Sequence, residues 1–209
     1  MSAAEQLDDQ SIGDFLGQLA ARMAAPGAGA TAAVEAALSA SLVAMVGRFT
    51  TEEAHADLVR EIVGEADAHR DACLAAAADD ETAFSAVAEA MKMPRGSQEE
   101  KEARRRRLSE VSLDATRPPL AVLASAGELV TLAARILPVA NRNLVSDVAA
   151  AAAAARAAAT TARLSVEANL PGIDDDAARA DLAAAVAGVG DLARRADDLE
   201  AEVRRRMRA

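Results

Sequence analysis

A glycine-rich turn precedes a segment of small residues near the start of the chain. Residues 26–29 read Pro-Gly-Ala-Gly, and a helical pattern rich in alanine follows from about Thr31 to Phe49. The first N–H groups of a helix have no partner within it, and they carry partial positive charge. Since glycine lacks a Cβ atom, Gly27 and Gly29 would let an anion approach these groups closely. The turn predicts either an anion site or only a tight connection between two helices. It is not a Walker loop, because no Gly-Lys-Ser/Thr sequence follows.

Two adjacent carboxylates form a second candidate for chemistry. Asp79 and Asp80 stand together, and Phe84 follows four residues after the second acid. A carboxyl group beside apolar neighbours can have a raised pKa and can serve as a general acid or base. The alternative interpretation is that both acids are exposed residues at the start of a helix.

Amides, a guanidinium group and an acid gather just before the longest alanine tract. Residues 141–147 read Asn-Arg-Asn-Leu-Val-Ser-Asp. Ser146 and Asp147 are ordinary capping residues for the helix that follows. A helix cap does not require the two asparagines and the arginine at residues 141–143. The amide and guanidinium groups of Asn143 and its neighbours could hydrogen-bond the edge of a flat heterocycle. Capping and ligand binding both stay open for this segment, and also for Asn169, which ends the alanine helix.

Composition restricts the partners and the compartment. The net charge is −10 and the pI is about 4.8, the opposite of the balance typical of nucleic-acid binders. The alanine tract of residues 149–155 is far shorter than the roughly 20 residues of a membrane span, and the N-terminus lacks signal-peptide features. The single cysteine, Cys73, cannot form an internal disulfide and makes no metal-binding spacing with His55 or His69. We therefore expect a cytoplasmic protein without a nucleic-acid, membrane or metal partner.

The elements that must position these groups are helices. Apolar residues make up 52% of the chain, many of them alanine, whereas aromatic residues make up only 1%. Alanine is the best helix former, and residues that favour strands are scarce. We expect an all-α fold in one domain over residues 1–209, with about ten flexible N-terminal residues and a bundle of about seven helices. Because several helices have faces too small to be stable alone, we also expect a dimer. The predicted helices cover about residues 12–23, 31–49, 52–78, 98–116, 118–137, 146–169 and a C-terminal stretch, while residues 79–91 open or continue a helix.

Five segments, in order, resemble the cyclodeaminase/cyclohydrolase family of folate enzymes. This family includes the C-terminal half of the bifunctional formiminotransferase-cyclodeaminase and stand-alone bacterial methenyltetrahydrofolate cyclohydrolases. The resemblance extends from about Ile12 to Val203, with the five segments at plausible spacing and without large insertions. The segments are FLGQLAARMAAPGAGATAA, LVAMVGRFT, DDETAFSAVAEAMKMP, NRNLVSDVA and LSVEANL.

The resemblance implies an all-α dimer with a folate site in a groove between helices. It implies a reaction at the N5–N10 bridge of tetrahydrofolate, either cyclodeamination of the 5-formimidoyl form or hydrolysis of the 5,10-methenyl form. A reduced folate would be the substrate, and no metal or permanently bound cofactor would be needed. In this interpretation Asp80 is the general acid/base. The implied substrate-binding residues are Gly27 and Gly29 through their N–H groups, Asn143, Ser146 and Asp147 at the pterin edge or a water, and Asn169.

Three departures from the family pattern leave an alternative open. Ala28 replaces the middle of three glycines, the lysine-rich stretch expected after Thr50 is absent, and Val148-Ala149 stands where a glycine is usual. These changes suit a catalytically inactive folate-binding or structural homologue of the same fold. A third interpretation is a helical interaction protein, since the C-terminal stretch carries a short heptad seam. The seam comprises Leu182, Val186, Val189, Leu192, Ala196, Leu199 and Val203.

Overall fold

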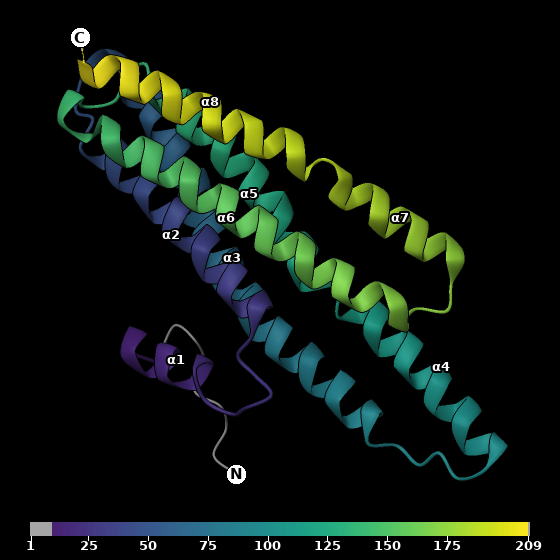
Figure 1. Ribbon diagram of the computed structural model, residues 1–209. Helices are drawn as coiled ribbons and strands as arrows, with labels where there is room; N and C mark the ends of the chain where they lie inside the picture. Colours follow the sequence, from purple (N-terminus) through teal and green to yellow (C-terminus); the bar gives the residue numbers. More distant parts are fainter. Residues whose placement is uncertain (1–9, 209) are drawn as a thin grey trace.

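The computed structural model describes residues 10–208, and within them all regular secondary structure is helical (Figure 1). The prediction of an all-α fold is therefore confirmed. The predicted flexible N-terminus concerns residues 1–9, which lie outside the described residues. The helices are α1 (Ile12–Leu19), α2 (Ala28–Arg48), α3 (Ala56–Met91), α4 (Gln98–Asp114), α5 (Arg117–Ile136), α6 (Val145–Asn169), α7 (Asp176–Ala187) and α8 (Val189–Arg208). Three short 3-10 turns, Glu53–His55, Arg142–Leu144 and Leu170–Gly172, lie before α3, α6 and α7.

Helices α2, α3, α5 and α6 form the body of the bundle, and α8 lies along α6 (Figure 1). Helix α5 supplies three of the largest fully buried side chains, Leu129, Leu132 and Ile136. It begins with Pro118 and Pro119 in its first turn, as the sequence predicts. Helix α3 runs past the start of α2, and its last turns, with Val87 and Ala90, pack on α4, which follows it in the chain. Helix α1 stands apart from the other helices, and Phe15 is its one buried residue.

Alanine forms the contact between α2 and α6. Ala32, Ala36 and Ala40 of α2 are fully buried, as are several alanines of α6. The side chains between α2 and α6 are mainly methyl groups, so the two backbones can lie close together. The buried Ser39 hydroxyl of α2 therefore donates to the Ala151 carbonyl of α6 over 2.8 Å. Each alanine buries little area, but the close packing of these small groups gives many van der Waals contacts, which stabilise the pair of helices.

The bulky residues of α2 face outward. The sequence places Val34, Leu38, Leu42, Met45 and Val46 on one side of this helix, yet only Val46 is buried, and Leu38 is 55% exposed. The face of α2 that packs into the bundle is the alanine face, because its small side chains allow α6 to pack against it at short distance. By length and composition α2 could cross a membrane, but 61% of its apolar window is buried in the bundle, as in a core helix.

Two helix boundaries differ from the expected ones. Helix α3 continues without a break through Asp79 and Asp80, and the C-terminal stretch divides at Gly188 into α7 and α8. The division at Gly188 brings the number of α-helices within the described residues to eight, against the expected seven or so, whereas the continuation of α3 was one of the two alternatives for residues 79–91. The C-terminal heptad seam is buried within the chain, with Leu192, Ala196 and the residues in register with them packed into the bundle core. The interpretation as an interaction protein therefore lacks the free seam on which it depends.

Candidate active site

The side chain of Asp80 points from α3 onto the start of α2. Its carboxyl group lies so close to Gly29 that a Cβ atom at this glycine would overlap all three carboxyl atoms. The described glycines have no positive φ angle, so the backbone conformation alone does not require glycine at position 29. Glycine is needed there for space, and the space is filled by a carboxyl group of the same chain.

Asp80 acts as a cap for α2 that comes from another helix. Gly27 is the N-cap residue of α2 and has no side chain to cap it, while its carbonyl accepts the Thr31 N–H over 3.0 Å. The Ala30 N–H, one of the first in α2, donates to the Asp80 carboxylate. A carboxylate near the first N–H groups of a helix also meets the positive end of the helix dipole.

Burial raises the pKa of Asp80 above its ordinary value of 3.8. The hydrogen bond from Ala30 opposes this rise, and the like charge of Glu81 adds to it. The neighbouring Asp79 is exposed, and so is Phe84, so the two adjacent acids have different environments. A carboxyl group whose pKa is raised toward neutrality is a better candidate for an acid/base catalyst than an ordinary exposed carboxylate.

The second group of predicted residues lies at the other end of α2. The Asn141 backbone N–H donates to Thr50 Oγ over 3.2 Å, and its side-chain amide donates to the Phe49 carbonyl over 3.3 Å. Asn141 Oδ1 in turn accepts the Asn143 N–H over 3.0 Å. This segment is therefore tied to the C-terminal end of α2. Asn143 and Ser146 are exposed.

Two adjacent pockets open beside this segment. One, of about 510 Å³, is lined by Asn143, Arg142 and Arg206, with Met207 at its side. The other, of about 500 Å³, is lined by Ser146 with residues of α6 and α8, including Met207 again. Asp147 is half-buried in the first turn of α6.

One chain does not bring the predicted residues together. The 21 residues of α2 span about 31 Å, with Gly27, Gly29 and Asp80 at one end and the segment 141–147 at the other. Helix α6 runs antiparallel to α2, as the Ser39–Ala151 and Glu35–Thr161 contacts show. Asn169 therefore lies toward the Gly29 end, where its amide donates to the Ser165 carbonyl over 2.9 Å.

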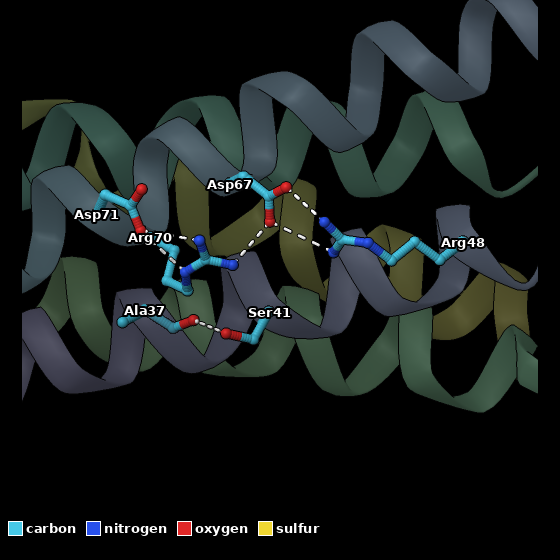
Figure 2. A network of polar contacts seen from close by, with 6 residues as sticks. All are labelled: Ala37, Ser41, Arg48, Asp67, Arg70 and Asp71. Carbon is cyan, nitrogen blue, oxygen red and sulfur yellow. Dashed lines mark hydrogen bonds and ion pairs between the residues drawn. The ribbon is translucent and has the colours of Figure 1, made fainter. Parts of the chain in front are cut away.

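The basic residue at the end of α2 is already paired. Figure 2 shows Arg48 against Asp67, 2.5 Å from Nη2 to Oδ2, and Arg70 bridging Asp67 and Asp71. The Arg48 side chain holds the pKa of Asp67 below its ordinary range. Arg48 therefore does not replace the lysine-rich stretch that the family has after this helix.

Sequence reasoning missed Glu35 and the environment of His69. Glu35 is a lone acid among the small residues of α2, half-buried, with the Thr161 hydroxyl 3.0 Å from its Oε2. His69 has its Nδ1 atom 3.2 Å from the Ser125 hydroxyl. That hydroxyl also meets buried Cys73, whose pKa burial raises. The isolated acid was visible in the sequence, whereas a contact between residues 56 positions apart was not.

Within residues 10–208, no group of three His, Cys, Asp or Glu side chains is placed to hold a metal ion.

Comparisons with known proteins identify the family of this chain. A family described as formiminotransferase-cyclodeaminase matches residues 11–188. A methenyltetrahydrofolate cyclohydrolase from Methylorubrum extorquens is 34% identical over 174 residues, which cover 81% of this chain and 83% of that protein.

The fold matches as well. The crystal structure of formiminotetrahydrofolate cyclodeaminase from Thermotoga maritima superposes with a TM-score of 0.81, at 24% identity, over 94% of this chain and 98% of that one. The match covers most of the chain and includes Asp80 together with both ends of α2. The chain is a member of the formiminotransferase-cyclodeaminase family.

Proposed function

We propose that this protein hydrolyses 5,10-methenyltetrahydrofolate to 10-formyltetrahydrofolate. The 34% identical relative, which carries the name of this activity, supports hydrolysis as the first choice. Cyclodeamination of 5-formimidoyltetrahydrofolate is the second, because both reactions pass through a tetrahedral carbon between N5 and N10. The observation that carries the proposal is the half-buried Asp80 carboxyl group against the start of α2, with its raised pKa.

Asp80 serves as the proton shuttle in this mechanism. Its carboxylate takes a proton from the water that adds to the methenyl carbon, and the tetrahedral intermediate forms. The protonated carboxyl group then gives this proton to N5 as the bond between N5 and the carbon breaks. The products are 10-formyltetrahydrofolate and a proton released to solvent, so one carboxyl group acts first as base and then as acid.

Gly29 contributes to this chemistry by admitting Asp80. The glycine leaves room for the carboxyl group to reach the Ala30 N–H, which fixes its position and supports its charged form. Gly27, at the N-cap, leaves the start of α2 free of side chains on the ligand side. Asn169 lies toward the same end and is the remaining contact from α6.

Asn143, Ser146 and Asp147 complete the site in a homodimer. They lie at the far end of α2 from Asp80, so a folate can meet both groups only if a second subunit supplies one of them. The enzyme is cytoplasmic, takes a reduced folate as its substrate and uses no metal or redox cofactor. It has no nucleic-acid or membrane partner.

The test is the loss of methenyltetrahydrofolate absorbance with purified protein. We expect turnover by the wild type and a loss of about 10²–10⁴-fold in Asp80→Asn, as for removal of a general acid/base. Asp79→Asn is the matched control, since this exposed neighbour lies outside the site and its variant should keep full activity. Ammonia release from 5-formimidoyltetrahydrofolate distinguishes the deaminase. Folate binding by calorimetry without turnover in either assay would instead identify the inactive homologue.

A further inference from the structure

The pocket beside the C-terminal end of α8 combines apolar walls with two arginines, and we call it the arginine pocket. Its volume of about 510 Å³ lies within the range of small-molecule sites. Leu137 and Met207 belong to its apolar lining, and Arg142 and Arg206 supply its charged groups. Among the described residues that line it there is no aspartate or glutamate. In a chain with a net charge of −10, such a lining favours an anion.

Two bonds within the chain hold Arg206 in place. Its Nη1 group donates to the Leu137 carbonyl over 2.9 Å, and its Nε group donates to Glu202 Oε1 over 2.8 Å. Among residues 10–208, its Nη2 group has no hydrogen-bond partner. A guanidinium group that is already oriented loses little side-chain freedom when it binds a further acceptor, and its planar N–H groups match a carboxylate. Arg206 is therefore a preorganised donor at the edge of the pocket.

Arg142 is a second donor whose charge the described part of the chain leaves uncompensated. It is exposed at the start of the short turn Arg142–Leu144, and within residues 10–208 its side chain makes no ion pair or hydrogen bond. Arg48 and Arg70, at the nearby end of α2 and on α3, are both paired with Asp67. The arginine pocket thus differs from the paired arginines of its surroundings, because its guanidinium groups have N–H donors left for a ligand.

The apolar lining suits an aromatic ring. Leu137 is almost fully buried and gives a fixed surface, whereas Met207 is 61% exposed on the last turn of α8. Methionine is flexible, and its polarizable sulfur makes favourable contacts with aromatic rings. The chemistry of the pocket therefore indicates a ligand with an aromatic group next to a carboxylate.

We propose that the arginine pocket binds the p-aminobenzoylglutamate end of the folate substrate. The benzoyl ring lies against Leu137 and Met207. The glutamate carboxylates accept hydrogen bonds from Arg142 and Arg206, as charge-assisted pairs.

This inference rests on the proposed function, which also gives the pocket its place beside the reaction. N10 of the folate is the nitrogen of the p-aminobenzoyl group, so the tail begins at the reacting bridge. Asn143 lines the arginine pocket, and in the proposed homodimer it completes the site around Asp80 of the partner subunit. The pocket then adjoins the side of the bridge from which the tail leaves.

Helix α8 contributes to the arginine pocket but not to the part of the chain that the family match covers. Arg206 and Met207 follow residue 188, where that match ends. The catalytic Asp80 lies well inside it. We therefore expect recognition of the tail to be a property of this chain's own C-terminal helix.

Calorimetry of the full-length protein with p-aminobenzoylglutamate tests the pocket without any need for turnover. We expect a Kd on the order of 0.1–1 mM, which is ordinary for a ligand of this size. The compound p-aminobenzamide has the ring but no carboxylate, so it should bind at least about tenfold more weakly. Arg142→Gln and Arg206→Gln should each weaken the binding of p-aminobenzoylglutamate about tenfold and leave that of p-aminobenzamide unchanged.

Arg205→Gln is the matched control. Arg205 is adjacent to Arg206 and pairs with the same Glu202, but it does not line the pocket, so its variant should bind as the wild type does. Circular dichroism establishes that all variants keep their helices. Equal binding of the two compounds by the wild type, or an Arg206→Gln protein that binds as the wild type does, would overturn the proposal.

Kinetics with two substrates test whether the pocket serves the reaction. Arg206→Gln should raise the KM for 5,10-methenyltetrahydrofolate about tenfold with kcat unchanged, because the tail binds equally in the ground state and the transition state. With 5,10-methenyltetrahydropteroate, which lacks the glutamate, the wild type and Arg206→Gln should have equal KM values. A rise in KM that is the same for both substrates would refute binding of the glutamate by Arg206.

The two measurements separate this inference from the proposed function. A wild type that binds p-aminobenzoylglutamate through both arginines but turns over no folate would support the pocket and refute the proposed function. An active wild type whose KM for the folate depends on neither arginine would refute the pocket alone.

Discussion

The carboxyl group of Asp80 occupies the space that a side chain at Gly29 would fill. This single relationship links the two most prominent features of the sequence, the glycine-rich turn and the pair of adjacent acids. It places the carboxyl group against the first N–H groups of α2, and it shields that group partly from water, which raises its pKa. Position and acidity therefore have a common structural cause.

Gly29→Ala should damage both stability and activity. The new methyl group would overlap the Asp80 carboxyl group, which must move away from the Ala30 N–H. We expect a loss of about 1–3 kcal/mol in the free energy of unfolding, as for other overpacked sites. Turnover should fall at least about tenfold, because the displaced acid is no longer aligned. Denaturant unfolding and the absorbance assay measure the two effects.

Gly64→Ala provides the control for this substitution. Gly64 lies on α3, where an added Cβ atom meets nothing within 4 Å, so alanine should keep activity and slightly raise stability. If Gly29→Ala behaved like Gly64→Ala, the close contact between Asp80 and Gly29 would be refuted.

Asp80→Asn should be more stable than the wild type at neutral pH. Since the pKa of Asp80 is raised in the folded state, the folded protein holds this proton more tightly than the unfolded chain does. The stabilising contribution is complete below the unfolded pKa, near 3.8, and is lost as the pH rises through the folded pKa. Asparagine has no such ionisation, so the melting temperature of Asp80→Asn should exceed that of the wild type at neutral pH.

Thermal unfolding across the acidic and neutral range measures this difference. It should disappear when the pH falls below about 3.8, and Asp79→Asn should show no comparable trend, because Asp79 is exposed. An Asp80→Asn protein that melts below the wild type at neutral pH would contradict an Asp80 whose pKa is raised by partial burial.

The acidic limb of the activity profile should respond to Glu81. Asp80 must be ionised to take a proton from water, so kcat/KM should fall as the pH drops through its raised pKa. The negative charge of Glu81 contributes to that raised pKa. Glu81→Gln should therefore move the acidic limb to lower pH and leave the plateau unchanged. A limb that stays in place, or moves upward, would mean that another group controls it.

A larger residue in the alanine contact should destabilise the fold. Ala155 of α6 is fully buried, so Ala155→Leu must separate α6 from its neighbours. We expect a loss of about 1–3 kcal/mol in the free energy of unfolding, measured by denaturant titration. Ala153→Leu, an exposed alanine on the same helix, should change stability by less than about 0.5 kcal/mol. Equal effects would show that α6 is not closely packed.

The sequence predicts the all-α class and the positions of the helices well, because alanine favours helix and proline ends it through local backbone effects. Pro118 and Pro119 start a helix as expected, and the breaks near Pro94 and Pro171 are present. The inward face of α2 is different. Leu38 looks like a core residue, and only the close fit of alanines between two helices decides that it faces outward.

The candidate site could be predicted in its parts but not in its assembly. Asp80 and Gly29 were both visible as unusual residues, yet nothing local indicates that one fills the space beside the other. The distance between Asp80 and Asn143 depends on which ends of α2 their segments meet, a tertiary property. Similarly, the contact of His69 with Ser125 joins α3 to α5 and leaves no periodic signal.

Helix α1 has only eight residues and contacts the bundle core through Phe15, its one buried side chain, and the partly buried Leu19. So short a helix is unstable by itself in water, so its hydrogen bonds persist only while that ring stays docked. Its amide protons should therefore exchange with solvent deuterium through a local opening that leaves the other helices intact. Such an opening would also expose the apolar pocket that lies between α1, α2 and α3. The shape of this pocket would then change with time, while the rest of the protein stays tightly packed.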